Sequence, residues 1–185
     1  MSITELFKRT ILYKKIYRPY RVQQLQKMKA IKSCEFNKHG LELLQKFVEV
    51  LDNNNIQYWL EFGSLLGAYR DKGFIKNELD IDVGAFLYDA NRIYNSLTKA
   101  GFSLVREFHV RGENGLEQPY ELGNTTIDVF YFFERDGYYI SNGVYNLKRK
   151  YTEENFNVCV CEYKFEKFDV IKIDFVGLHV GVPSN

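Results

Sequence analysis

Residues 56–86 read IQYWLEFGSLLGAYRDKGFIKNELDIDVGAF, and this stretch decides the fold. Its opening run, 56–62, is apolar and aromatic and predicts a buried strand that ends at Gly63 and Ser64. A short helical pattern follows as far as Tyr69, which places unpaired backbone N–H groups at the positive end of the helix dipole. Such a helix start is a natural seat for a phosphate group.

The segment that follows, 79–83, alternates apolar and acidic residues. Side chains in a strand alternate with a period of two, so Asp80 and Asp82 should project from one face while Ile81 and Val83 enter the core. Two carboxylates on one rigid face, close to a phosphate seat, are what a magnesium-dependent phosphoryl-transfer centre requires.

A third carboxylate comes from the run 125–133, where Asp128 is the only acid among apolar residues and threonines. A lone buried Asp is costly unless it binds a cation or accepts several hydrogen bonds. Asp128 is therefore predicted as a third metal ligand or as the base that deprotonates an acceptor hydroxyl. The alternative is a buried structural acid paired with an arginine.

The ordered combination of Gly-Ser, Asp-x-Asp and a later single Asp is typical of the polymerase-beta-like nucleotidyltransferase fold. That fold is an α/β (α+β) arrangement with a mixed, twisted sheet and flanking helices. The block 63–75 followed by Asp80-Ile81-Asp82 also resembles the LicD/fukutin family. The resemblance implies an enzyme that transfers phosphocholine or a polyol phosphate from a CDP-activated donor to a glycan or lipid-linked glycan.

Site residues follow from the pattern and the resemblance together. Asp80, Asp82 and Asp128 are the predicted metal and catalytic residues, with Mg²⁺ as the expected ion and Mn²⁺ as the alternative. The donor's phosphates are assigned to the backbone of Gly63 and Ser64 and to the side chains of Arg70 and Lys72. Arg70 matches the family block, whereas Lys72 is equally consistent with a solvated loop charge. The three histidines have no metal-ligand spacing and no nucleophile beside them, so covalent catalysis has no support.

Two departures from the family pattern leave other functions open. The family usually has Pro-Trp-Asp-Asp before Asp-x-Asp, where this chain has Lys76-Asn77-Glu78-Leu79. It also usually continues past a Val-Pro, so the ending at Asn185 indicates a shortened form or a dispensable segment. The alternatives are a nucleotidyltransferase acting on a small molecule or protein, and a non-catalytic binding module with the same fold.

Charge divides the chain into a basic N-terminal helical appendage, 1–33, and a nucleotidyltransferase-like domain, 34–185. The appendage has nine Lys or Arg and one acid, Glu5, a net charge of +8. The whole chain carries +1, so the remainder carries −7. A basic amphipathic segment can lie on an anionic membrane near a lipid-linked acceptor. Helices packed on the domain with solvated charges are an equal alternative, and no nucleic-acid reading motif is present.

The sequence has neither a transmembrane-length apolar run nor a signal-peptide pattern. The expectation is therefore a cytoplasmic enzyme, which would lie at the inner face of the membrane if the appendage binds lipid. The resemblance implies a role in the modification of capsule, teichoic acid or lipopolysaccharide. Hydrophobic periodicity predicts helices at 37–53 and 89–100, and Pro19 is expected to interrupt the helical pattern of the appendage. It predicts strands at 102–110, 118–122, 125–133, 138–141 and 156–163, and further strands within 168–182, with the loop 111–115 as a hairpin connection.

Overall fold

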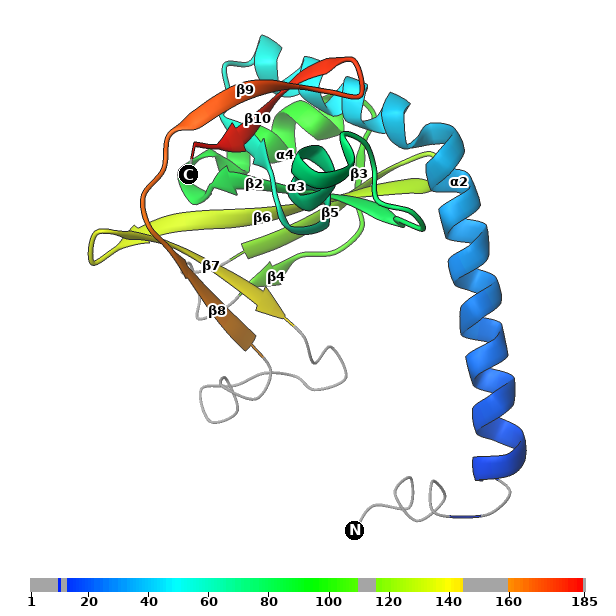
Figure 1. The fold of residues 1–185 in the computed structure, drawn as a ribbon. Helices are drawn as coiled ribbons and strands as arrows, with labels where there is room; N and C mark the ends of the chain where they lie inside the picture. The colour runs from blue at the N-terminus through cyan, green and yellow to red at the C-terminus, as the bar shows by residue number, and fades with distance from the viewer. Residues whose placement is uncertain (1–9, 11–12, 110–115, 145–159, 185) are drawn as a thin grey trace.

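The computed structural model describes residue 10 and residues 13–109, 116–144 and 160–184. The predicted hairpin loop at 111–115 and the first part of the predicted strand at 156–163 lie outside these residues. Figure 1 shows a strongly curved sheet with helices packed around it and one long helix that extends away from it.

The long helix is α2 (Arg18–Asn53), and it follows a single π-helical turn, η1 (Tyr13–Tyr17). The sequence predicts an interruption at Pro19 and a separate helix from residue 37, but the structure has one continuous helix of 36 residues. Pro19 lies in its first turn, where the missing N–H costs no hydrogen bond. The proposed boundary at residue 33 therefore falls inside α2.

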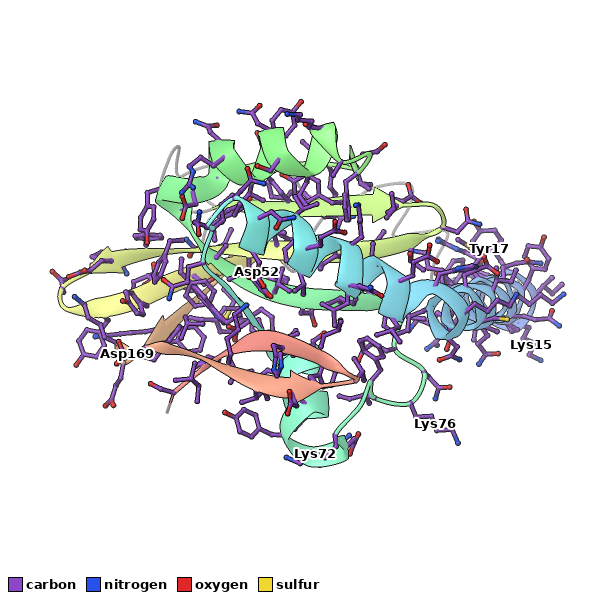
Figure 2. The ribbon with its side chains drawn as sticks, turned by 90° about the horizontal axis from the view of Figure 1, so that it is seen from above. Lys15, Tyr17, Asp52, Lys72, Lys76 and Asp169 are labelled. Atoms are coloured by element: carbon purple, nitrogen blue, oxygen red, sulfur yellow. The ribbon has the colours of Figure 1, made fainter. Side chains whose placement is uncertain are left out.

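Only the second half of α2 packs on the domain. Its buried residues begin at Ser33 and Phe36 and continue through Leu51, whereas residues 14–32 are almost all exposed. In Figure 2 Lys15 and Tyr17 lie at the far end of the helix, well away from Asp52.

Within the described residues, the main sheet has eight strands, and only one pair of them is parallel. Its central order is β1-β2-β6-β5-β3, with β4 paired to β5 and with β7 joining β6 to β8. The strands are β1 (Tyr58–Leu60), β2 (Asp80–Phe86), β3 (Ser103–Leu104), β4 (Phe108–His109), β5 (Leu116–Leu122), β6 (Thr125–Arg135), β7 (Tyr138–Val144) and β8 (Val160–Phe165). The predicted strand at 102–110 is wrong as one element, because it forms two short strands, β3 and β4, with irregular backbone between them.

The remaining elements cover the sheet and its edge. Helix α3 (Phe62–Leu66) continues into a π-helical turn, η2 (Gly67–Asp71), and η3 (Leu87–Asp89) leads into α4 (Ala90–Lys99). The last two strands, β9 (Val170–Phe175) and β10 (Leu178–Pro183), form a separate antiparallel hairpin. This hairpin lies close to β1, where a Cβ on Gly181 would be 2.1 Å from the carbonyl oxygen of Tyr58, so a larger residue has no space there.

The two faces of the sheet bury different side chains. One face packs Ile81, Val83 and Ile127 against Phe47 of α2 and Leu97 of α4, and all five are fully buried. This is the apolar side of the alternating strand predicted from the sequence. Helices α2 and α4 therefore form one layer, and the acidic residues of β2 are left on the opposite face.

The opposite face carries a second, aromatic cluster. Trp59 lies within 5.1 Å of Phe86 and 5.0 Å of Phe132, measured between ring centroids. Trp59 crosses β2 at Gly84, where a Cβ would lie 2.3 Å from the indole nitrogen, so only glycine lets the indole lie there. The acidic residues and this aromatic cluster thus share one face of the sheet.

No helix among the described residues combines the length and the apolar character needed to cross a bilayer.

Candidate active site

The three predicted acids meet on neighbouring strands. Strands β2 and β6 run parallel, and Asp82 is the register partner of Asp128, while Asp80 pairs with Thr126. Asp80, Asp82 and Asp128 are all partly buried, and the strand neighbours Ile81, Val83, Ile127 and Val129 are fully buried. The sheet thus brings carboxyl groups from positions 80, 82 and 128 to one place.

Helix α3 fixes Asp82 through two hydrogen bonds. The backbone N–H of Gly63 donates to Oδ2 of Asp82 at 3.2 Å, and the N–H of Asp82 donates to Oγ of Ser64 at 2.9 Å. Ser64 is 2% exposed, so its hydroxyl orients the acidic strand from within the protein. In this state the N–H of Gly63 already holds a carboxylate, and the assignment of Gly63 and Ser64 to phosphate stays a prediction.

The junction between β1 and α3 is strained. Phe62 has φ +43°, a left-handed conformation that costs a residue with a Cβ about 1–3 kcal/mol. Its ring packs edge-on against Phe130, 4.9 Å away between centroids, which holds the turn in place. A Cβ on Gly63 would lie 3.3 Å from carboxylate oxygens of both Asp82 and Glu78, so glycine lets the two acids approach the helix start.

Burial and mutual repulsion disfavour the charged forms of these acids. Burial, with the nearby charges of Asp80 and Asp128, raises the pKa of Asp82 to about 8 despite the hydrogen bond from Gly63. Burial, with the charges of Asp80 and Glu117, raises the pKa of Asp128 to about 7. Burial also raises the pKa of Asp80. A bound positive charge would therefore stabilise the ionised form of these carboxyl groups at neutral pH.

The donor chemistry of the site fits a divalent cation. Carboxylate oxygens on two adjacent strands are hard ligands of the kind Mg²⁺ prefers, and within the described residues no ion pair neutralises Asp80, Asp82 or Asp128. As the side chains lie, however, the described part of the chain has no group of three or more His, Cys, Asp or Glu already arranged around a point that could hold a metal. Metal binding by these three acids stays a prediction.

Two cations that the sequence did not single out lie near the acids. The charges of Lys32 and Arg106 lower the pKa of both Asp80 and Asp128, against the larger effect of burial. Lys32 lies on α2 one turn before Phe36, and Arg106 pairs with Glu117 at 3.5 Å. No local motif identifies either residue, because their positions depend on how α2 and the segment between β3 and β4 pack on the sheet.

Arg70 and Lys72 lie elsewhere in the fold. Arg70 is exposed and donates from Nε and Nη2 to the carboxylate of Asp71 at 2.7 and 2.8 Å. Lys72 is exposed with φ +53° at the end of η2, and Figure 2 shows it on the outer side of the molecule. Both follow the C-terminal end of the helix whose N-terminal end holds Asp82. The structure does not bring them into contact with the acids, and their role in donor binding stays a prediction.

Glu61 is a further carboxyl group on the same face. Its N–H donates to the carbonyl oxygen of Asp82 at 3.0 Å, and its carboxyl accepts a 2.7 Å hydrogen bond from the indole of Trp59. Glu61 is 5% exposed, and burial raises its pKa. It connects the acidic end of this face to the aromatic cluster.

Comparison with known proteins finds relatives of this chain. A family profile described as LicD/FKTN/FKRP, nucleotidyltransferase domain, matches residues 55–185. Ribitol-5-phosphate transferase FKTN of Mus musculus is 29% identical over 88% of this chain, which corresponds to 33% of the relative. Ribitol 5-phosphate transferase FKRP of Homo sapiens is 30% identical over 52% of this chain and 21% of its own length. The chain thus spans about a third of the length of FKTN.

Two solved structures were also found by their shape. ANT(2″)-Ia in complex with adenylyl-2″-tobramycin covers 54% of this chain and 53% of its own, with a TM-score of 0.44 and 19% identity. The lincosamide antibiotic adenylyltransferase LnuA, lincomycin-bound, covers 76% of this chain and 78% of its own, with a TM-score of 0.46 and 13% identity.

The raised pKa of Asp82 predicts that Asp82→Asn stabilises the metal-free protein at alkaline pH. Between pH 3.8 and about 8 the unfolded chain ionises at Asp82 while the folded chain keeps the proton, so wild-type stability falls as pH rises through that window. The side-chain amide of Asn does not titrate, and its oxygen can still accept the hydrogen bond from the N–H of Gly63. In EDTA, the variant should gain roughly 1–3 kcal/mol of unfolding free energy at pH 8 and little at pH 4.5.

Urea denaturation at both pH values measures this difference. Asp136→Asn, in the exposed turn between β6 and β7, is the matched control and should change stability equally little at either pH. An Asp82→Asn protein that is no more stable than wild type at pH 8 would show that the carboxylate is not electrostatically strained.

Proposed function

The chain belongs to the LicD/FKTN/FKRP nucleotidyltransferase-domain family, and from this membership we propose that it transfers a phospho-alcohol from a CDP-activated donor to a glycan hydroxyl. The group transferred is a polyol phosphate such as ribitol phosphate, or phosphocholine, and the product is a modified cell-surface polysaccharide. The observation that carries the proposal is the pairing of Asp82 with Asp128 on parallel strands, beside a helix start that holds Asp82. These residues provide a rigid acidic site without a nucleophile of its own.

The mechanism is direct displacement by the glycan hydroxyl at the phosphorus that carries the alcohol, so that the bond to the bridging oxygen breaks, CMP leaves and a new phosphodiester forms. Asp80, Asp82 and Asp128 would hold Mg²⁺, or Mn²⁺, which supplies Lewis-acid polarisation of the phosphate oxygens and offsets their charge. Asp82 is oriented for this role by Gly63 and Ser64. Asp128 completes this metal site or, as the alternative, acts as the base that accepts the proton of the attacking hydroxyl.

Lys32 and Arg106 are the cations placed to meet the donor's diphosphate. Each lies close enough to Asp80 and Asp128 to lower the pKa of both carboxyls. An arginine and a lysine at the rim of an acidic site can neutralise phosphate oxygens that the carboxylates would otherwise repel. They therefore complement the donor.

The projecting half of α2 would place this site at an anionic membrane surface. Residues 13–34 contain seven Lys or Arg and no acid. Ile16, Leu25, Met28 and Ile31 of this segment are 49–65% exposed, in a helix that nothing else in the described chain covers. Basic charge combined with exposed apolar side chains favours binding to anionic lipid, and a lipid-linked glycan acceptor would then lie nearby.

Donor binding is the first prediction of this proposal. With Mg²⁺ present, one CDP-alcohol among CDP-ribitol, CDP-glycerol and CDP-choline should raise the melting temperature by about 5–10 °C at a hundred times its Kd. Asp80→Asn/Asp82→Asn should abolish the shift. Lys32→Ala should weaken it, while Lys29→Ala on the same helix should not. Selective stabilisation by CTP or ATP would instead favour nucleotidyl transfer, and no shift with any nucleotide would favour a non-catalytic module.

Membrane binding is the second prediction. The protein should sediment with vesicles of phosphatidylcholine and phosphatidylserine but not with phosphatidylcholine alone, and salt should weaken the binding. Lys27→Glu/Lys29→Glu should reduce binding by on the order of tenfold or more, since each basic residue contributes about 1 kcal/mol at an anionic surface. Lys46→Glu, in the packed half of α2, is the matched control. Equal binding to both vesicle types would show that the basic residues are simply solvated and do not bind anionic lipid.

A further inference from the structure

A large cavity in the described part of the chain lies away from the acids. It has a volume of about 920 Å³ and opens where β2 and β6 end, bounded by the start of α4 and by the link between β8 and β9. Phe86 lies four residues beyond Asp82 along β2, which is about 13 Å in a strand. The mechanism proposed above makes no use of this cavity.

Its floor is a set of aromatic rings that are held in place. Phe86 and Tyr88 stack with centroids 5.2 Å apart and planes 14° apart. Tyr139 lies edge-on to Phe86 and to Phe168, at 5.1 Å in each case. Phe86 also packs on the buried Trp59, so the floor is anchored to the second core cluster.

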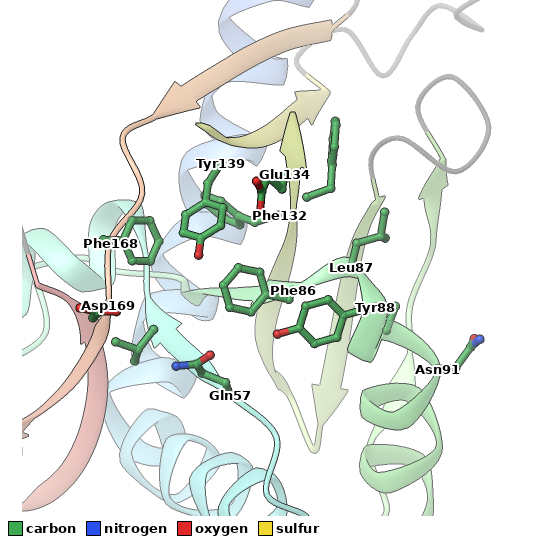
Figure 3. Close-up of a pocket in the computed structure, with 13 residues that line it drawn as sticks. Gln57, Phe86, Leu87, Tyr88, Asn91, Phe132, Glu134, Tyr139, Phe168 and Asp169 are labelled. Atoms are coloured by element: carbon green, nitrogen blue, oxygen red, sulfur yellow. The ribbon is translucent and has the colours of Figure 1, made fainter. Parts of the chain in front are cut away.

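One ring of this set is exposed to solvent. Tyr88 is 75% exposed, although burying such a ring against the protein would be favourable. Figure 3 shows the hydroxyl groups of Tyr88 and Tyr139 directed toward the space around Phe86. A flat, open aromatic surface with hydroxyls pointing inward is suited to a ligand that has both apolar and hydrogen-bonding faces.

The polar residues around the rings are uncharged or acidic. Gln57 and Asn91 supply amides, and Glu134 and Asp169 supply carboxylates, all exposed, whereas no Lys or Arg lines the cavity. Lys167, next to the cavity-lining Phe168, pairs with Glu134 at 2.6 Å. A nucleotide or phosphate would therefore be repelled by the acidic side chains and would find no cation in the lining to pair with. The cavity is better suited to a neutral ligand rich in hydroxyl groups.

We propose that this cavity binds neutral sugar residues of the glycan acceptor, remote from the residue that is modified; this rests on the proposed function for the identity of the acceptor. The apolar faces of sugar rings lie on Tyr88 and Tyr139, which Phe86 supports from below. Sugar hydroxyls donate to Glu134 and Asp169 and bond to the amides of Gln57 and Asn91. Because the cavity and the acids share one face of the sheet, one oligosaccharide chain can reach both.

Binding of neutral oligosaccharides, measured by titration calorimetry without nucleotide or metal, tests the proposal. The probes are oligomers of glucose, galactose, mannose and N-acetylglucosamine, with tobramycin as a cationic comparison. At least one neutral oligomer should bind, and Tyr88→Ala should weaken it by about tenfold, the loss expected for one aromatic contact. Asp169→Asn should also weaken it, while Asp82→Asn should not.

Tyr94→Ala is the matched control, because Tyr94 is an exposed tyrosine on α4 that does not line the cavity. No neutral oligomer binding, binding indifferent to Tyr88→Ala, or selective binding of tobramycin would each overturn the proposal.

A second readout separates this proposal from the proposed function. If the enzyme transfers its group and Tyr88→Ala raises KM for a long acceptor but not for a monosaccharide acceptor, both hold. If KM is unchanged for the long acceptor, the sugar site is wrong and the transfer activity stands. If no transfer occurs with any donor but Tyr88-dependent oligosaccharide binding persists, the sugar site stands without the activity.

Discussion

The parallel pairing of β2 with β6 is the constraint on which the site depends. It sets Asp82 beside Asp128, and it leaves Ile81, Val83, Ile127 and Val129 fully buried on the other face. A shift of one residue in either strand would bury the acids and expose the apolar side chains, so the core that stabilises the sheet also fixes the acidic cluster. Helix α3 adds the second restraint, because Gly63 and Ser64 bind the carboxylate and the backbone of Asp82.

This arrangement carries an energetic cost that is typical of functional sites. Asp82 and Asp128 are held where burial and mutual repulsion raise their pKa values, and Phe62 adopts a left-handed backbone at the start of α3. The two apolar clusters on either side of the sheet offset that cost. A bound cation would relieve the repulsion, which is why the acidic cluster is better explained by ligand binding than by folding stability.

The sequence alone predicts the local pattern well and the long-range placement poorly. Alternation across Asp80 and Asp82 and the isolated Asp128 identified the acids, because a strand's period of two is visible in the residues themselves. Lys32 and Arg106 were missed, since their approach to the acids depends on the packing of α2 and of the irregular backbone after β3. Pro19 misled the prediction of α2, because proline ends a helix in its interior but is favourable in the first turn. The cavity at Tyr88 also had no sequence signal, as its rings come from four separate segments.

The most direct test of the account is the identity of the nucleotide released during turnover. With Mg²⁺, the preferred CDP-alcohol and a glycan acceptor, ³¹P NMR should show CMP and a new phosphodiester forming in equal amounts. Asp82→Asn and Asp128→Asn should each slow this by at least about a hundredfold. Release of pyrophosphate from CTP or ATP in place of CMP, or CMP release that persists in both variants, would contradict the assignment of the Asp80, Asp82 and Asp128 cluster as the centre of phospho-alcohol transfer.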